Sequence, residues 1–179
     1  MMDCQGVVLL VIDLQENLLA KIPVADEVLR RSKRLVQFAR ALEIPILWTE
    51  QYPRGLGTTA ATLTEQLTGL APLEKLSFGC FGAAGFPEAV AATGRDQLLI
   101  IGVEAHVCVM QTVLVAMERG FQAYVVRDAV ASRRRTDYKA GLARMQANGA
   151  QIVTAEMAMF EMLRVAGTPR FKKILPLIK

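Results

Sequence analysis

Residues 97–120, QLLIIGVEAHVCVMQTVLVAMERG, place a carboxylate, an imidazole and a thiol within five positions: Glu104, His106 and Cys108. The segment begins as a continuous apolar run and continues as an apolar helix, so the three side chains fall at the junction. The free N–H groups and partial positive charge of a helix start stabilise a thiolate, which makes Cys108 a candidate nucleophile with a lowered pKa. Taken alone, Cys108 is equally well interpreted as a buried structural cysteine.

Two further reactive side chains follow apolar segments. Asp13 ends the run GVVLLVID, and Lys75 lies within PLEKLS. A lone aspartate at such a place is commonly a helix cap, and a lone lysine is commonly solvated. Considered with Cys108, the residue types suggest one site. Asp13 would take the thiol proton, Cys108 would attack an electrophilic carbon, and Lys75 would stabilise charge near both.

The segments that must position these residues alternate between strand-like and helical patterns. Strands are expected at 6–13, 46–50, 72–77, 96–103, 122–129 and 150–155, and helices at 24–42, 62–67, 87 onward, 108–119, 136–148 and 156–164. This alternation predicts an α/β fold, a Rossmann-like three-layer α/β/α sandwich around a doubly wound, six-stranded parallel sheet. Ligands of such folds bind at the carboxyl ends of the strands, where Asp13, Lys75 and Cys108 all fall.

The length of 179 residues predicts a single domain, residues 1–179, and 53% hydrophobic residues suit a well-buried sheet. No apolar run reaches the ~18–20 residues that span a bilayer, and no basic leader precedes the first strand. We therefore expect a cytoplasmic protein with no membrane partner. The basic run Arg133 to Arg135 lacks accompanying aromatics or a nucleic-acid motif, so it favours a solvated loop over a nucleic-acid partner.

The three cysteines are widely spaced, at Cys4, Cys80 and Cys108, and no CxxC pair occurs. A disulfide framework is therefore disfavoured, and a chain with a single histidine is a poor candidate for a zinc site. Because the first strand is followed by IDLQENLL, which contains no glycine, a dinucleotide site at that turn is also disfavoured.

Three motifs together resemble the isochorismatase-like cysteine hydrolase family: LLVIDLQ with Asp13, Lys75 before LSFGCFG, and IIGVEAHVCV with Cys108. The resemblance covers nearly the whole chain and includes the later segments FQAYVVRDAVASR and GAQIVTAEMAMFEML. The segments EQYPRGLG, GVEAHVC and FKKILPLIK are most similar to the branch called isochorismatase domain-containing proteins. The resemblance implies an Asp13–Lys75–Cys108 triad on a six-stranded parallel sheet.

The resemblance also implies a cis peptide bond between Val103 and Glu104. By the same analogy, the backbone N–H groups of Glu104 or Ala105 and of Cys108 form an oxyanion hole. The turn would then deliver the nucleophile and its oxyanion donors together. Glu104 and His106 would either line the pocket or support the residues that line it.

The sequence departs from the nicotinamidase branch, which carries Asp-x-His-x-x-x-His after the second strand for a metal. The matching stretch EQYPRGL offers Glu50, Tyr52 and Leu56, so we expect neither a metal nor another cofactor. True isochorismatases act on a vinyl ether without a cysteine nucleophile. A chain that carries Cys108 favours amide, imide or nitrile-like carbon electrophiles instead.

The resulting hypothesis is a metal-independent hydrolase that cleaves a C–N bond of a small-molecule substrate through a thioester. Gln15, Tyr52, Phe78 and His106 are the expected substrate contacts, together with Glu104. One alternative is a binding or interaction protein that retains the fold with little catalysis. Another is a redox protein in which Cys80 approaches Cys108.

We expect a homo-oligomer, a dimer or larger. Relatives in the family are commonly dimers or larger, and the tail 171–179, FKKILPLIK, exposes Ile174, Leu175, Leu177 and Ile178 unless something covers them. These residues either pack on their own domain or meet another subunit, and the sequence leaves both possibilities open.

Overall fold

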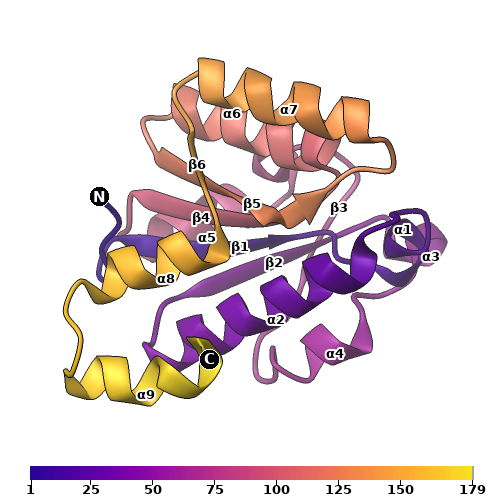
Figure 1. Ribbon diagram of the computed structural model, residues 1–179. Coiled ribbons are helices and arrows are strands. Elements are labelled where there is room, and N and C mark those ends of the chain that lie inside the picture. Colours follow the sequence, from indigo (N-terminus) through magenta and orange to yellow (C-terminus); the bar gives the residue numbers. More distant parts are fainter. Residues whose placement is uncertain (179) are drawn as a thin grey trace.

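The computed structural model describes residues 1–178, which contain a six-stranded sheet in the order β3-β2-β1-β4-β5-β6 (Figure 1). Each pair of neighbouring strands is parallel. The doubly wound, six-stranded parallel sheet that the sequence predicts is thus confirmed. The strands are β1 (Val7–Ile12), β2 (Ile46–Gln51), β3 (Leu73–Lys75), β4 (Gln97–Val103), β5 (Gln122–Ala131) and β6 (Gln151–Val153).

Helices cover both faces of the sheet and complete the three layers (Figure 1). One face carries α1 (Glu16–Leu19), α2 (Ala25–Ala41), α4 (Ala61–Thr64), α8 (Ala155–Leu163) and α9 (Pro169–Ile178). The other face carries α5 (Phe86–Ala92), α6 (Met110–Glu118) and α7 (Arg135–Ala147). The short helix α3 (Pro53–Leu56) contacts α1.

The central strands are apolar throughout because they are buried on both faces. All six residues of β1 are buried. Val7, Leu9 and Val11 belong to the core on the α2 side, whereas Val8 and Leu10 belong to the core on the α6 side. This period-two division of one strand between two cores is what a continuous apolar run in a parallel sheet produces.

The tail, for which the sequence pattern indicated no helix or strand, forms helix α9. Ile174 is fully buried, and Phe171 and Leu177 pack against the core on the α2 side. Spacings of three residues put these side chains on one helical face, and the intervening Lys172 and Lys173 are exposed. The tail therefore packs on its own chain, which settles the alternative that the sequence left open.

Other boundaries differ by a few residues. The helix expected at 62–67 ends at Thr64, and the loop after β2 contains the single turn α3. Strand β5 continues to Ala131, two residues beyond the expected end. Among the described residues, no helix is long and apolar enough to cross a membrane. A single domain over residues 1–179 stays a prediction.

Candidate active site

The site forms where the strand order reverses, since β2 and β3 lie on one side of β1 and β4 to β6 on the other. Ile12 of β1 pairs with Gly102 of β4, so the residues that follow these two strands are neighbours. Gly102 has a φ of +127°, and a Cβ built there would lie 2.0 Å from the Ile12 carbonyl oxygen. Only glycine permits this approach of the two strand ends.

Asp13 follows β1 in the left-handed region, with a φ of 51°, and its side chain is fully buried. Its two carboxylate oxygens have different partners. The Thr49 hydroxyl donates to Oδ1 at 2.7 Å, and Lys75 Nζ donates to Oδ2 at 2.6 Å. Asp13 is thus held as a paired, hydrogen-bonded carboxylate, the condition under which a buried charge is tolerated.

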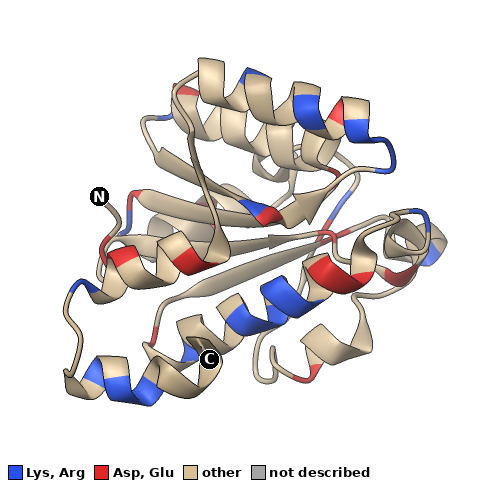
Figure 2. Ribbon diagram, viewed as in Figure 1, with Lys and Arg blue, Asp and Glu red and all other residues tan. Residues whose placement is uncertain are grey.

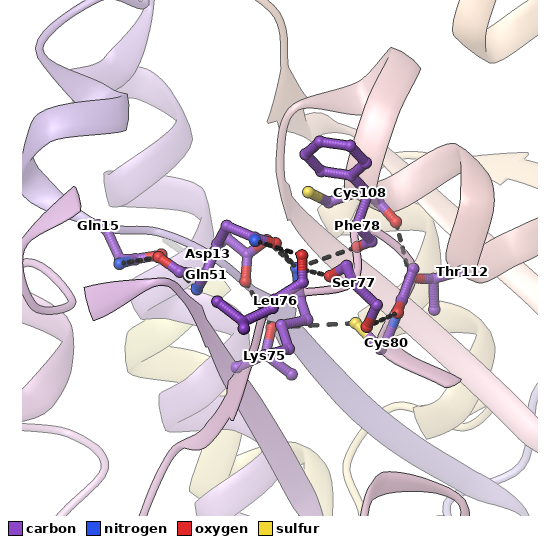
Figure 3. Close-up of polar contacts among 12 residues, drawn as sticks. Asp13, Gln15, Gln51, Lys75, Leu76, Ser77, Phe78, Cys80, Cys108 and Thr112 are labelled. Atoms are coloured by element: carbon purple, nitrogen blue, oxygen red, sulfur yellow. Dashed lines mark hydrogen bonds and ion pairs between the residues drawn. The ribbon is translucent and has the colours of Figure 1, made fainter. Parts of the chain in front are cut away.

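Lys75 ends β3 at the position paired with Gln51 of β2, and its side chain is also inaccessible to solvent. Besides Asp13, its ammonium donates to Gln51 Oε1 at 2.7 Å and to the carbonyl oxygens of Phe78 at 3.0 Å and Ser77 at 3.3 Å (Figure 3). The loop after β3 therefore wraps the ammonium with its own backbone, and Lys75 stands as a fixed cation beside Asp13.

Cys108 lies in a π-helical turn, Ala105–Val109, that leads into α6. The peptide bond between Val103 and Glu104 is cis, at the position that the family resemblance implies. Val107 and Val109 donate their N–H groups to the Glu104 carbonyl oxygen. The turn starts at the carboxyl end of β4. A helix start leaves its first N–H groups without intrahelical acceptors.

The pKa of the Cys108 thiol is raised, contrary to the expectation from its place at a helix start. Burial, followed by the negative charge of Asp13, raises its pKa to about 12, and the charge of Lys75 lowers it only in part. The desolvation of the thiolate outweighs the stabilisation that a helix start gives. At rest the thiol is therefore protonated, with a carboxylate and an ammonium beside it.

A second buried thiol belongs to the same cluster. Cys80 is fully buried, and burial followed by the charge of Asp13 raises its pKa to about 11. Thr112 of α6 connects it to Cys108, since its hydroxyl accepts from the Cys80 N–H at 3.0 Å and donates to the Cys108 carbonyl oxygen at 2.7 Å. Thr112 thus fixes the loop after β3 against the π-helical turn (Figure 3).

Glu104 and His106, the other reactive residues of the turn, contact the segment that follows β5. Glu104 Oε2 accepts hydrogen bonds from the Arg133 backbone N–H at 2.8 Å and from its Nε at 3.1 Å. His106 Nδ1 lies 2.9 Å from Ser132 Oγ, and Nε2 lies 4.0 Å from Asp137 Oδ2. These contacts brace the turn, and substrate contact by His106 stays a prediction.

The remaining predicted substrate residues lie in three different settings. Gln15 is fully buried and joins the end of β2 to the following loop, donating to Gln51 O at 3.0 Å and Gly57 O. Tyr52 and Phe78 are about half exposed, at 51% and 55%. In Figure 3 the Phe78 ring and the Cys108 sulfur project to the same side of the cluster. Their roles in binding stay predictions.

Sequence reasoning missed Thr49, Gln51 and Thr112 as parts of this cluster, and it raised the approach of Cys80 to Cys108 only for the redox alternative. A signal for the first two exists: Thr49 and Gln51 are polar residues two apart at the end of a buried strand, so they share one face. That face is the one that meets Asp13 and Lys75. Thr112 has no such signal, because a threonine inside an apolar helix is an ordinary core residue.

Glu50, which stands at the first position of the stretch compared with the nicotinamidase branch, lies near the end of β2. The Glu50 carboxylate accepts hydrogen bonds from the backbone N–H of Thr59 at 2.7 Å and from its hydroxyl at 2.8 Å. Within residues 1–178, no group of three or more His, Cys, Asp and Glu side chains is placed to hold a metal ion.

Together the cluster contains a thiol, a carboxylate that can accept its proton, a fixed ammonium and a helix start. This set is suited to nucleophilic attack on an electrophilic carbon with charge stabilisation nearby. The isochorismatase domain model matches residues 7–157. Isochorismatase domain-containing protein 2A of Mus musculus is 37% identical over 175 residues, which cover 96% of this chain and 82% of the mouse protein.

Two solved structures have the same fold. A structure described as the MAR1 ribonuclease of Caenorhabditis elegans has a TM-score of 0.92 and 36% identity, covering 99% of this chain and 91% of its own. The YcaC gene product of Escherichia coli, described as an octameric hydrolase of unknown specificity, has a TM-score of 0.92 and 26% identity, covering 98% of this chain and 88% of its own.

Proposed function

The chain belongs to the isochorismatase family, and from that premise we propose that it is a cysteine hydrolase of a small-molecule C–N bond. Cys108 acts as nucleophile, Asp13 as general base and Lys75 as the cation that holds Asp13 in place. The single observation that carries the proposal is the buried Lys75–Asp13 pair, 2.6 Å apart, beside a thiol whose pKa both charges affect.

In the first half-reaction, Asp13 accepts the thiol proton as the Cys108 sulfur attacks the carbonyl carbon of an amide or imide. The raised thiol pKa requires this coupling, because a resting thiolate is scarce at neutral pH. The oxyanion of the tetrahedral intermediate accepts hydrogen bonds from the N–H groups of Cys108 and of Glu104 or Ala105. The intermediate collapses to a thioester as the C–N bond breaks, and the proton on Asp13 passes to the departing nitrogen.

In the second half-reaction, water replaces the amine. Asp13 accepts a proton from the water while the water oxygen attacks the thioester carbon. The C–S bond breaks, the acid product leaves, and the proton returns to the Cys108 sulfur. The ammonium of Lys75 stays within 2.6 Å of the carboxylate and offsets its charge while Asp13 cycles between its two states. No step requires a metal or another cofactor.

A panel of small aliphatic and aromatic amides, imides and nitriles tests the proposal, with release of ammonia or amine as the measurement. We expect turnover of at least one member by the unmodified chain and none by Cys108→Ala. The matched control is Cys4→Ala, whose sulfur lies outside the cluster and donates to the Met162 carbonyl oxygen. Cys4→Ala should retain turnover. Equal turnover by Cys108→Ala and the unmodified chain would refute the proposal.

Two other functions are distinguishable by the same variants. The solved relative named a ribonuclease makes RNA cleavage one of them. Single-stranded RNA should be stable in the presence of the unmodified chain, and Cys108-dependent cleavage would replace amide hydrolysis as the function. A binding protein that only retains the fold would give no turnover of any panel member with Cys108 present.

The proposal includes the setting of the enzyme. We place it in the cytoplasm as one domain over residues 1–179, with a small-molecule substrate and neither nucleic acid nor membrane as partner. The three cysteines are free thiols, as suits a reducing compartment. The octamer named for the Escherichia coli relative supports a homo-oligomer. Light scattering of this protein in solution would test the assembly.

A further inference from the structure

A hollow opens at the carboxyl end of the sheet, between the start of α2, the end of β5 and the start of α7. Its volume is about 440 Å³. This lies within the ~300–1,000 Å³ typical of small-molecule sites. Its lining includes Arg133 and residues of all three elements, but none of Asp13, Lys75 and Cys108. The hollow therefore lies beside the three proposed catalytic side chains and does not enclose them.

The wall of the hollow is largely apolar. Val28 and Val130 line its inner wall and are almost inaccessible to solvent, whereas Val24 is 52% exposed. Tyr138 closes one side, with its hydroxyl donating to the Arg127 carbonyl oxygen at 2.7 Å. Because that hydroxyl is already bonded to the protein, the side chain is held in place, and its ring is available as apolar surface.

The charges around the hollow do not balance locally. Its two acids, Glu27 and Asp128, both contact Arg31, which lies outside the lining, at 2.7 and 3.5 Å. Figure 2 shows the acidic first turn of α2 and the basic turn that leads into α7. Within residues 1–178, neither Arg127 nor Arg135 forms an ion pair, although both line the hollow.

Arg133 connects this hollow to the candidate active site. It lines the hollow, and its guanidinium and backbone N–H both bind the Glu104 carboxylate beside the cis peptide bond. The hollow thus shares a wall with the turn that carries Cys108. Arg127 and Arg135, which have no acidic partner among residues 1–178, remain the cations available to a ligand.

We propose that this hollow binds a small amphipathic anion, with an apolar body against Val24, Val28 and Val130 and a carboxylate between Arg127 and Arg135. Apolar area provides most of the affinity, and the two arginines select the charge. The site is distinct from the proposed hydrolase centre and does not depend on its activity.

The test uses octanoate as the probe and octan-1-ol as the uncharged control. Binding of each is measured from the methyl chemical shifts of the isotope-labelled full chain. We expect saturable shifts of Val24, Val28 and Val130, with weaker binding of the alcohol. Arg135→Gln should weaken octanoate about three- to fivefold, the usual worth of a partly exposed ion pair. The matched control Arg144→Gln, at the far end of α7, should leave the dissociation constant unchanged.

Cys108→Ser provides the second control, since a separate site should bind octanoate equally well without the nucleophile. The proposal is overturned by the absence of saturable shifts up to 10-millimolar octanoate, on the order of the weakest small-molecule affinities. It is also overturned if the shifts cluster around Cys108 instead. Equal effects of Arg135→Gln and Arg144→Gln would mean that only overall charge attracts the probe.

Discussion

The alkylation rate of Cys108 is the property that most directly reflects its electrostatic surroundings. Iodoacetamide reacts with the thiolate, so the rate follows the fraction of Cys108 that is ionised. A pKa of about 12 instead of the ordinary 9.0 lowers that fraction about a thousandfold at neutral pH. A thiolate of higher pKa is a better nucleophile by about 20-fold, so the net rate should be about 50-fold below that of a free thiol.

Two substitutions should change this rate in opposite directions. Asp13→Asn removes the second-largest cause of the raised pKa, so alkylation should accelerate although turnover is lost with the base. Lys75→Met removes the charge that lowers the pKa, so alkylation should slow. The rate of the unmodified chain should rise tenfold per pH unit from pH 7 to 10 without a plateau, because that whole range lies below the pKa.

Mass spectrometry of the Cys108 peptide separates this thiol from the other two. Cys4 is buried outside the cluster and serves as the internal control for folding. A substitution that only loosens the fold accelerates Cys4 as well, whereas an electrostatic effect is confined to the cluster. A plateau of the Cys108 rate below pH 9 would refute this reasoning, as would shifts of the same sign in both variants with Cys4 unchanged.

Three further predictions concern stability. The raised pKa values of Cys80 and Cys108, about 11 and about 12, lower the free energy of unfolding as pH rises above 9, by about 1.4 kcal/mol per pH unit for each thiol up to pH 11. Urea unfolding between pH 9 and 11 should show this decline, and Cys108→Ala should remove the part that one thiol contributes. Gly102→Ala should cost about 3 kcal/mol or more, since its Cβ would meet backbone at 2.0 Å with φ at +127°. Gly94→Ala, with open space around it and a φ of +63°, should cost only about 1 kcal/mol. Thr112→Val should cost about 1–3 kcal/mol by leaving the Cys80 N–H without an acceptor, and Thr112→Ser should restore it. An unchanged slope, equal glycine costs or a stable valine variant would contradict the respective inference.

The fold was predictable from the sequence because its signals are local and repeated. Runs such as 6–13 and 96–103 are short, largely apolar and partly β-branched, which favours strands buried on both faces, and amphipathic segments separate them. The helical tail was harder, because nine residues with lysines between apolar positions suit either period until a partner surface is known. Contact with α2 decides it, and that contact joins residues far apart in the sequence.

The clustering of Asp13, Lys75 and Cys108 was predictable, whereas the electrostatics of the cluster were less so. The strand ends indicate Asp13 and Cys108, since carboxyl ends of parallel strands meet at one edge. The pKa of Cys108 depends on how deeply the turn is buried and on the distance to Asp13, and neither follows from a motif. The helix start alone suggests a lowered pKa, and burial reverses its sign.

The most direct test of the proposed chemistry is detection of the thioester. The unmodified chain and Cys108→Ser are mixed with the best amide or imide of the panel, quenched in acid within the first turnover and digested for mass spectrometry. We predict the mass of the acyl group on the Cys108 peptide of the unmodified chain, carried by the sulfur and removed by hydroxylamine. Turnover of the same substrate with no acyl mass on that peptide, or with the acyl group on another residue, would contradict nucleophilic catalysis by Cys108.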